Sequence, residues 1–179
     1  MIPAWFSTIR TEAVTPLDPA KTGQALSALV AREDIADASR VLWDQGYHLE
    51  DLSACDVTEG FVVKYHFAHW VEAGRITLRV GVPHDDAAIP TISEVFPGAD
   101  WHERECHDFH GVVFTGHPNL SALLLPDDDT PPPLVKTDAA RKSRTDVMPL
   151  EYLVDSDVPP EAGKTEKKTT APATEAAAG

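Results

Sequence analysis

Cysteine is scarce in this chain of 179 residues, which contains only Cys55 and Cys106. Two cysteines cannot build a disulfide framework or a four-cysteine metal site, and they lack the repeated spacing that holds an iron–sulfur cluster. The sequence also lacks a glycine-rich phosphate loop and a dinucleotide-binding fingerprint. We therefore expect a reducing compartment and no redox cofactor bound by this chain.

Basic residues are few as well. Fifteen Lys and Arg residues stand against 29 Asp and Glu residues, which gives a formal net charge of −14. Because binding to nucleic-acid phosphates relies on an excess of lysine and arginine, this composition excludes nucleic acid as the main partner. The acidic surface is compatible with basic protein partners.

Long apolar runs are absent too. Runs such as residues 122–126 fall far short of the roughly 20 residues that a membrane-spanning helix needs. The first ten residues, MIPAWFSTIR, lack the basic and apolar regions of a secretory signal. We expect this chain to reach a membrane only through another subunit.

Composition divides the chain into four parts. Breakers interrupt residues 1–23, which we expect to form a frayed N-terminal arm, with docking of its apolar residues Trp5, Phe6 and Ile9 as the alternative. Residues 24–130 predict one α+β domain, in which a small, mostly antiparallel sheet packs on helices. Residues 131–154 are rich in proline and charge, and an apolar island near their end predicts an extended segment that docks on a partner. Residues 155–179 are of low complexity and predict a disordered tail.

Periodicity locates the elements of this domain. Apolar residues at helical spacing predict a first helix over residues 24–45, which a break near Glu33 would divide in two. Alternating apolar and polar side chains predict strands over residues 47–58, 61–67 and 75–82. We expect the last two strands to form a hairpin packed on the first helix.

Two further helices are predicted from capping boxes, in which an N-cap residue is followed three residues later by glutamate. Thr91 and Glu94 predict a short helix. Asp100 and Glu103 predict a second helix, which ends at Gly111 because glycine readily adopts the left-handed exit conformation.

The second of these helices, residues 101–110, carries His102, Cys106 and His110 at intervals of four residues on one face. The pattern is similar to a zinc-protease helix whose second histidine is replaced. However, the outer two side chains stand about 12 Å apart along the axis, too far to meet at one ion. A small stand-alone metal-dependent enzyme stays an alternative hypothesis. We expect no metal ligand, cofactor-binding residue or catalytic residue on this chain.

The same helix carries charged and aromatic residues of the kind found at protein interfaces. Glu103 and Glu105 flank Arg104, and Arg104 precedes Asp108 by four residues, a spacing that predicts an ion pair on one face. Arginine and aromatic residues are enriched at buried contacts, and Trp101 frames the group. We therefore interpret the helix and the turn after it as a docking element. Its candidate residues are Trp101, Glu103, Arg104, Glu105, Asp108, Gly111, Gly116, His117 and Pro118.

The stretch PGADWHERECHDFHGVVFTGHPNLSALLLPDD resembles the signature of the 30 kDa subunit of respiratory complex I, the bacterial NADH–quinone oxidoreductase. That signature reads Ala-x-Trp-x-Glu-Arg-Glu, then Asp and Gly, then Phe-x-Gly-His-Pro-x-Leu and Leu-x-Pro-Asp-Asp. The resemblance covers residues 25–130. The matching residues are Ala99, Trp101, Glu103, Arg104, Glu105, Asp108, Gly111, Phe114, Gly116, His117, Pro118, Leu120, Leu124, Pro126, Asp127 and Asp128.

The chain departs from this pattern at several positions. Ser121 and Ala122 replace two basic residues, Asp129 replaces a tryptophan, and His110 stands where the family has a hydrophobic residue. A Pro-Leu-Arg-Lys element survives only in part at residues 133–136. Related subunits occur in energy-converting nickel–iron hydrogenases, so the equivalent subunit of a membrane-bound hydrogenase is an alternative.

The resemblance implies a cofactor-free accessory subunit in the peripheral arm of a membrane-bound, ion-translocating complex, on the cytoplasmic side of the cell membrane. It implies packing against a large subunit of the 49 kDa type beside the quinone site, and proximity to the small iron–sulfur subunit. Iron–sulfur clusters and quinone, or a nickel–iron centre, would lie in those partner subunits.

Overall fold

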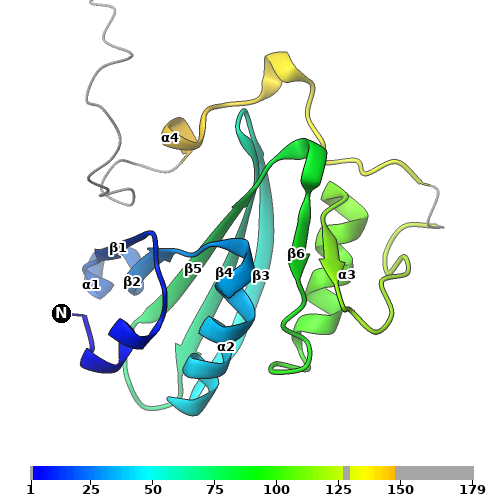
Figure 1. Cartoon of the computed structure of the whole chain (residues 1–179). Coiled ribbons are helices and arrows are strands. Elements are labelled where there is room, and N and C mark those ends of the chain that lie inside the picture. Colours follow the sequence, from blue (N-terminus) through cyan, green and yellow to red (C-terminus); the bar gives the residue numbers. More distant parts are fainter. Residues whose placement is uncertain (1, 127–129, 148–179) are drawn as a thin grey trace, which may run out of the picture.

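The computed structural model describes residues 2–126 and 130–147 (Figure 1). The strands are β1 (Ala13–Pro16), β2 (Gln24–Leu29), β3 (Tyr47–Val57), β4 (Gly60–His69), β5 (Arg75–Val82), β6 (Ala88–Pro90) and β7 (Val113–Thr115). The helices are α1 (Pro19–Thr22), α2 (Ile35–Asp44), α3 (Ala99–His110) and α4 (Arg144–Val147). Short 3-10 turns are η1 (Ala4–Thr8), η2 (Arg32–Asp34), η3 (His84–Asp86) and η4 (Asp138–Ala140).

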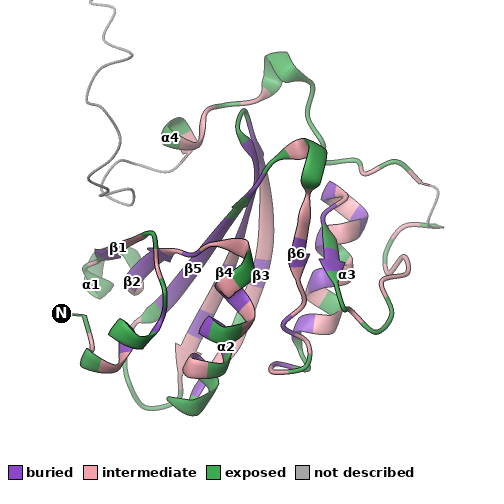
Figure 2. Cartoon of the chain, viewed as in Figure 1, coloured by how far each residue is buried: buried purple, intermediate pink, exposed green. Residues whose placement is uncertain are grey.

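The main sheet has the strand order β1-β2-β5-β4-β3, and a second sheet is formed by β6 and β7. In the main sheet only β2 and β5 run parallel, while the other neighbouring pairs are antiparallel. Figure 2 shows buried residues running along β4 and β5, and α2 and α3 both pack against β3. The predicted α+β domain with a mostly antiparallel sheet is therefore confirmed.

The meander of β3, β4 and β5 agrees with the predicted strands. β5 coincides with the predicted strand 75–82, and it forms the predicted hairpin with β4. Its apolar residues Ile76 and Leu78 are almost fully buried in the main core. Gly60 makes the β3–β4 turn at a φ of 143°, where an added Cβ would lie 2.0 Å from the Val82 carbonyl oxygen. Only glycine fits this turn.

The predicted helix over residues 24–45 is wrong in its first half. Residues 24–29 form β2, and the α-helix is confined to residues 35–44. Leu26 and Ala28 are buried in the main core, so the apolar residues of this stretch follow a period of two. Pairing with β1 on one side and β5 on the other gives β2 its backbone partners, and this tertiary context decides the strand state.

The expected frayed arm is wrong for residues 4–22. Phe6 and Ile9 are buried in the main core, at 2% and 5% exposure. β1 pairs antiparallel with β2, and the Asp18 side chain caps α1 by accepting the Ala20 N–H at 3.0 Å. Apolar anchors and strand pairing tie this end of the chain to the domain.

Residues 130–147, which we call the strap, lie against their own domain. The buried Asp56 carboxylate accepts the Lys136 N–H at 2.7 Å, Arg141 Nε at 3.0 Å and His84 Nε2 at 2.8 Å. Burial raises the pKa of Asp56, but these hydrogen bonds outweigh it and hold the pKa below its usual value. The rest of the predicted docking segment, residues 148–154, and the predicted tail lie outside the described residues. Their docking on a partner stays a prediction.

Candidate docking surface around helix α3

Glu103 points into the protein. The predicted capping box of Asp100 and Glu103 is wrong, because α3 begins at Ala99 without a side-chain cap and the Glu103 side chain is fully buried. Its carboxylate accepts hydrogen bonds from Thr91 Oγ1 at 2.5 Å and from the Ile92 N–H at 2.8 Å. These bonds tie α3 to the segment that follows β6.

Thr91 is accordingly not a helix N-cap. Its hydroxyl donates to Glu103 and accepts the Ser93 N–H at 3.1 Å. Residues 91–98 form turns, so the short helix predicted from Thr91 and Glu94 is wrong. The threonine side chain that the capping box would use at the start of a helix is engaged by another element.

Burial raises the pKa of Glu103 to about 7, although the hydrogen bonds from Thr91 and Ile92 lower it. The nearby Asp100 carboxylate raises it further. Glu103 therefore titrates near neutral pH, within a site closed to solvent.

The turn at residues 116–118 is fixed against the start of α3. The Asn119 N–H donates to His117 Nδ1 at 3.1 Å, which leaves the proton on Nε2. His117 Nε2 donates to the Asp100 carbonyl oxygen at 3.2 Å and lies 3.9 Å from the Glu103 carboxylate. Gly116 begins this turn at a φ of 84°. The His117 side chain is fully buried and serves the fold rather than a surface.

The predicted ion pair between Arg104 and Asp108 is wrong, because both side chains turn to the loop of residues 119–126. Arg104 Nε donates to the Ser121 carbonyl oxygen and Arg104 Nη2 donates to that of Ala122, each at 2.9 Å. The planar guanidinium suits this two-pronged contact.

Asp108 holds the next part of the same loop. Its Oδ2 accepts the N–H groups of Leu123, Leu124 and Leu125 at 3.0, 2.7 and 3.2 Å. Burial raises the pKa of Asp108, but the three backbone donors outweigh it and keep the pKa below its usual value. One carboxylate thus organises three consecutive residues.

The inward use of these polar groups leaves apolar side chains on the outside. Trp101 on α3 is 68% exposed, and Leu124 on the loop that Asp108 holds is 60% exposed. Leu134 of the strap is 51% exposed, and its N–H donates to the Phe109 carbonyl oxygen at 3.0 Å, at the end of α3. We call Trp101, Leu124 and Leu134 the α3 surface. These three exposed apolar side chains are candidates for contact with a partner.

The nine predicted interface residues divide into two groups. Exposed residues, which stay candidates for partner contact, are Trp101, Glu105, Gly116 and Pro118. Residues that build the element from inside are Glu103, Arg104, Asp108, Gly111 and His117. Sequence reasoning missed Leu134, whose exposure depends on where the strap lies.

The hypothetical metal ligands do not converge. His102 Nδ1 lies 3.8 Å from Asp51, and Cys106 Sγ donates to the Leu52 carbonyl oxygen at 3.9 Å, while His110 is buried two turns away. Burial raises the pKa of Cys106 to about 12, so this side chain is a thiol at neutral pH. Within residues 2–126 and 130–147, no three His, Cys, Asp or Glu side chains are grouped as metal ligands. No helix in this part is long and apolar enough to cross a bilayer.

The family model described as respiratory-chain NADH dehydrogenase, 30 Kd subunit, matches residues 28–144, which is more than half of the chain. The chain belongs to this family. A relative, a subunit of the NADH-quinone oxidoreductase of Roseiflexus castenholzii, is 42% identical over 118 residues. The match covers 62% of this chain and 68% of the relative.

Two solved structures share the fold of this 30 kDa subunit family member. The trypsin-resistant fragment of Nqo5 is 28% identical, with a TM-score of 0.51, and the match covers 59% of this chain and 89% of the fragment. A chain of the membrane-bound sulfane sulfur reductase, an archaeal respiratory membrane complex, is 25% identical with a TM-score of 0.55. That match covers 61% of this chain and 67% of the other.

The departures from the family signature at residues 121 and 122 leave the architecture around α3 intact. Arg104 binds the backbone carbonyl oxygens of Ser121 and Ala122, so the bonds do not depend on the side chains at these positions. The side chains only change what the loop presents outward. The departure at Asp129 lies outside the described residues.

Proposed function

We propose that this chain is a cofactor-free accessory subunit in the peripheral arm of a membrane-bound, ion-translocating NADH–quinone oxidoreductase. Membership of the 30 kDa subunit family and 42% identity to an NADH-quinone oxidoreductase subunit support this role. The observation that carries it is the arrangement around α3. Internal hydrogen bonds engage the polar side chains of Glu103, Arg104 and Asp108. The apolar side chains of Trp101 and Leu124 are exposed to solvent.

The α3 surface packs against the large subunit of the 49 kDa type, next to the quinone site, and supports its assembly. An aromatic anchor among apolar side chains is typical of the centre of a protein interface. The formal charge of −14 favours a basic partner. Iron–sulfur clusters and quinone lie in partner subunits, with the iron–sulfur small subunit nearby. The chain is held on the cytoplasmic side of the membrane through the complex.

A second candidate is the equivalent subunit of a membrane-bound energy-converting nickel–iron hydrogenase or related complex. The similarity to the archaeal sulfane sulfur reductase favours it, since that respiratory complex is named for sulfane sulfur rather than NADH. The partners discriminate between the two. NADH-binding subunits indicate the quinone reductase, and a large subunit with nickel-ligand cysteines indicates the hydrogenase.

Affinity purification of the N-terminally tagged chain from native membranes tests the proposal. We expect a large subunit of the 49 kDa type to be recovered with it, and this recovery to fall about tenfold when Trp101→Ala and Leu124→Ala are combined. Trp70→Ala is the matched control, because Trp70 is 80% exposed in the turn after β4. The proposal fails if no large subunit is recovered, or if the control loses as much partner as the double variant.

A further inference from the structure

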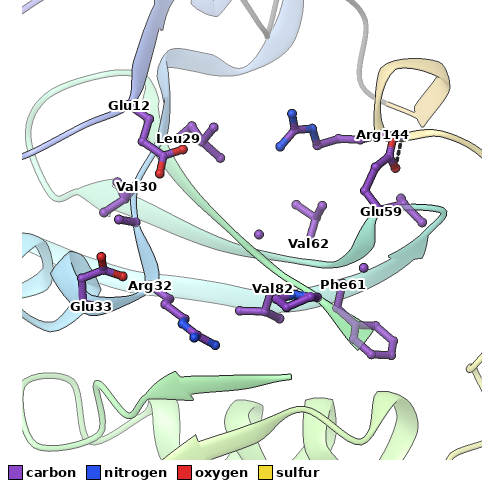
Figure 3. A pocket seen from close by; sticks show the side chains of 15 residues that line it. Glu12, Leu29, Val30, Arg32, Glu33, Glu59, Phe61, Val62, Val82 and Arg144 are labelled. Atoms are coloured by element: carbon purple, nitrogen blue, oxygen red, sulfur yellow. Dashed lines mark hydrogen bonds between the residues drawn. The ribbon is translucent and has the colours of Figure 1, made fainter. Parts of the chain in front are cut away.

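A groove of about 410 Å³ opens at the end of the main sheet, where β5 runs past the last paired residue of β2 (Figure 3). The last pair of the β2–β5 ladder joins Leu29 to Arg79. The chain then leaves the sheet and enters η2, which begins at Arg32. β5 continues to Val82, so its last residues have β4 on one side and the groove on the other.

Gly81 directs its backbone N–H and C=O toward this groove. The Arg79 carbonyl oxygen accepts the Val30 N–H at 2.9 Å, so the backbone groups of Arg79 face β2. Alternate residues of a strand direct these groups to the same side, so those of Gly81 face the space where β2 would continue. No described backbone group bonds to them on that side, and Gly81 is exposed. β5 therefore presents one free donor and one free acceptor at an open sheet edge.

The lining beside this edge is apolar and leaves room for another chain. Leu29, Val57 and Val62 line the groove, and Val62 is the residue of β4 that pairs with Gly81. An added Cβ at Gly81 meets no heavy atom within 4 Å. The open edge thus lies next to apolar side chains that an incoming strand can cover.

The groove also carries negative charge that the described residues do not neutralise. Arg32 is engaged by Asp86 at 2.6 Å, and Glu59 accepts the Arg144 N–H at 2.8 Å. Glu12 and Glu33 are exposed, and neither forms a salt bridge with a described residue. Both belong to the β2 end of the groove, as Figure 3 shows. Charged residues that line the groove are Glu12, Arg32, Glu33, Glu59 and Arg144.

We propose that the groove binds an extended segment of a partner subunit, which adds a short strand beside β5 where β2 leaves the sheet. Its backbone bonds to the N–H and C=O of Gly81, and an apolar side chain covers Leu29 and Val62. A lysine or arginine of the segment meets Glu12 and Glu33. When an extended peptide joins a sheet edge, the backbone bonds supply affinity and the alternate side chains supply specificity.

Charge favours this occupant over a second copy of the chain. The formal net charge of −14 makes two copies repel each other, and it attracts a basic segment to the same site. The contact rests on the proposed place of the chain in a multisubunit complex. It is separate from the α3 surface, with which the groove shares no residue.

Amide hydrogen exchange at Gly81 tests the proposal, measured in the free full-length chain and in the native complex recovered with the N-terminally tagged chain. We expect the Gly81 amide to exchange at least about tenfold more slowly in the complex, because the added strand accepts its N–H. Val82 is the internal reference. Its backbone groups face Phe61 of β4, so its amide is protected equally in both samples.

Glu12→Lys combined with Glu33→Lys tests the charge of the segment. We expect the protection of Gly81 in the complex to fall about tenfold, because like charges then meet across the groove. Asp44→Lys combined with Glu72→Lys is the matched control. It makes the same change of net charge at two exposed residues outside the groove, and the protection of Gly81 should persist.

Four results would overturn the proposal. Slow exchange of Gly81 in the free chain means that the chain fills the groove itself, and exchange that slows as the free chain is concentrated indicates a second copy. Equal exchange in the free chain and the complex shows that no strand is added, and protection that survives the Glu12 and Glu33 reversal excludes a basic segment. Recovery of the large subunit without protection of Gly81 overturns this inference alone, whereas no recovery overturns the proposed function on which it rests.

Discussion

Asp108 Oδ2 lies 2.7 Å from the backbone nitrogen of Leu124, in the loop that packs on α3. The same oxygen accepts two further N–H groups, so Asp108→Ala leaves three donors without their acceptor. We expect the free energy of unfolding, measured in urea, to fall by about 2–3 kcal/mol. Glu105→Ala is the control, because this exposed carboxylate on the same helix contributes little. Equal losses in the two variants would contradict the assigned role.

Glu103 predicts a pH dependence of the opposite sign to that of Asp56 and Asp108, whose pKa values are lowered by hydrogen bonds despite burial. Burial raises its folded pKa to about 7, so the folded state binds the proton more tightly than the unfolded chain. Stability therefore falls as pH rises from about 4.5 to 7 and is level above that. We expect Glu103→Gln to gain about 2–3 kcal/mol over the unaltered chain between pH 5 and pH 8, because its amide oxygen still accepts the Ile92 N–H while its NH2 group donates to Thr91 Oγ1 and carries no titrating proton. Urea denaturation across this range checks the difference, and parallel pH profiles would refute the assignment.

The meander could be predicted from sequence because its signal is local. Residues 75–82 alternate apolar and polar side chains, and neighbouring strands pair through short turns. The strand β2 could not be predicted in this way. Leu26 and Leu29 also fit a helical spacing, and the strand state comes from pairing with β5, far along the chain.

The residues of the docking element could be predicted from the sequence, but the hydrogen-bond partners of those residues could not. Thr91 and Glu103 each look like part of a local capping box, yet they bond to each other across 12 positions. Asp56 shows the limit most clearly. An acidic residue between Cys55 and Val57 in a strand pattern needs a partner if it is buried. The identity of that partner, Arg141, depends on the path of the strap.

Arg104 is predicted to matter more for assembly than for the fold of the isolated chain. Arg104→Ala frees the carbonyl oxygens of Ser121 and Ala122, which loosens the loop that carries Leu124. We expect recovery of the large subunit to fall several-fold while the free chain loses about 1 kcal/mol of unfolding free energy. Arg40→Ala serves as the control, since Arg40 pairs with Asp37 on an exposed helix face. Co-purification of the large subunit and thermal melting of the free chain test this prediction. Equal relative losses of recovery and of stability would contradict the claim that Arg104 acts mainly on assembly.

Asp56 is predicted to keep the strap closed to proteases. Asp56→Asn weakens the bond to Arg141, so trypsin should cleave after Lys136 and Arg141 at least about tenfold faster. The folded pKa of Asp56 is lowered, so its contribution is present above about pH 4 and is lost as pH falls through the folded pKa. Asp138→Asn is the control, because its side chain is 97% exposed although it also contacts Arg141. Unchanged cleavage in Asp56→Asn would show that other contacts hold the strap.

The parallel pairing of β2 with β5 has a consequence for how the chain folds. Leu26 lies beside Ile76, and the chain between these two residues includes α2, β3 and β4. Closing so long a loop carries an entropic cost that neighbouring hairpins avoid. We therefore expect β3, β4 and β5 to acquire amide protection first during refolding, and β1 and β2 to join that template in the slower step.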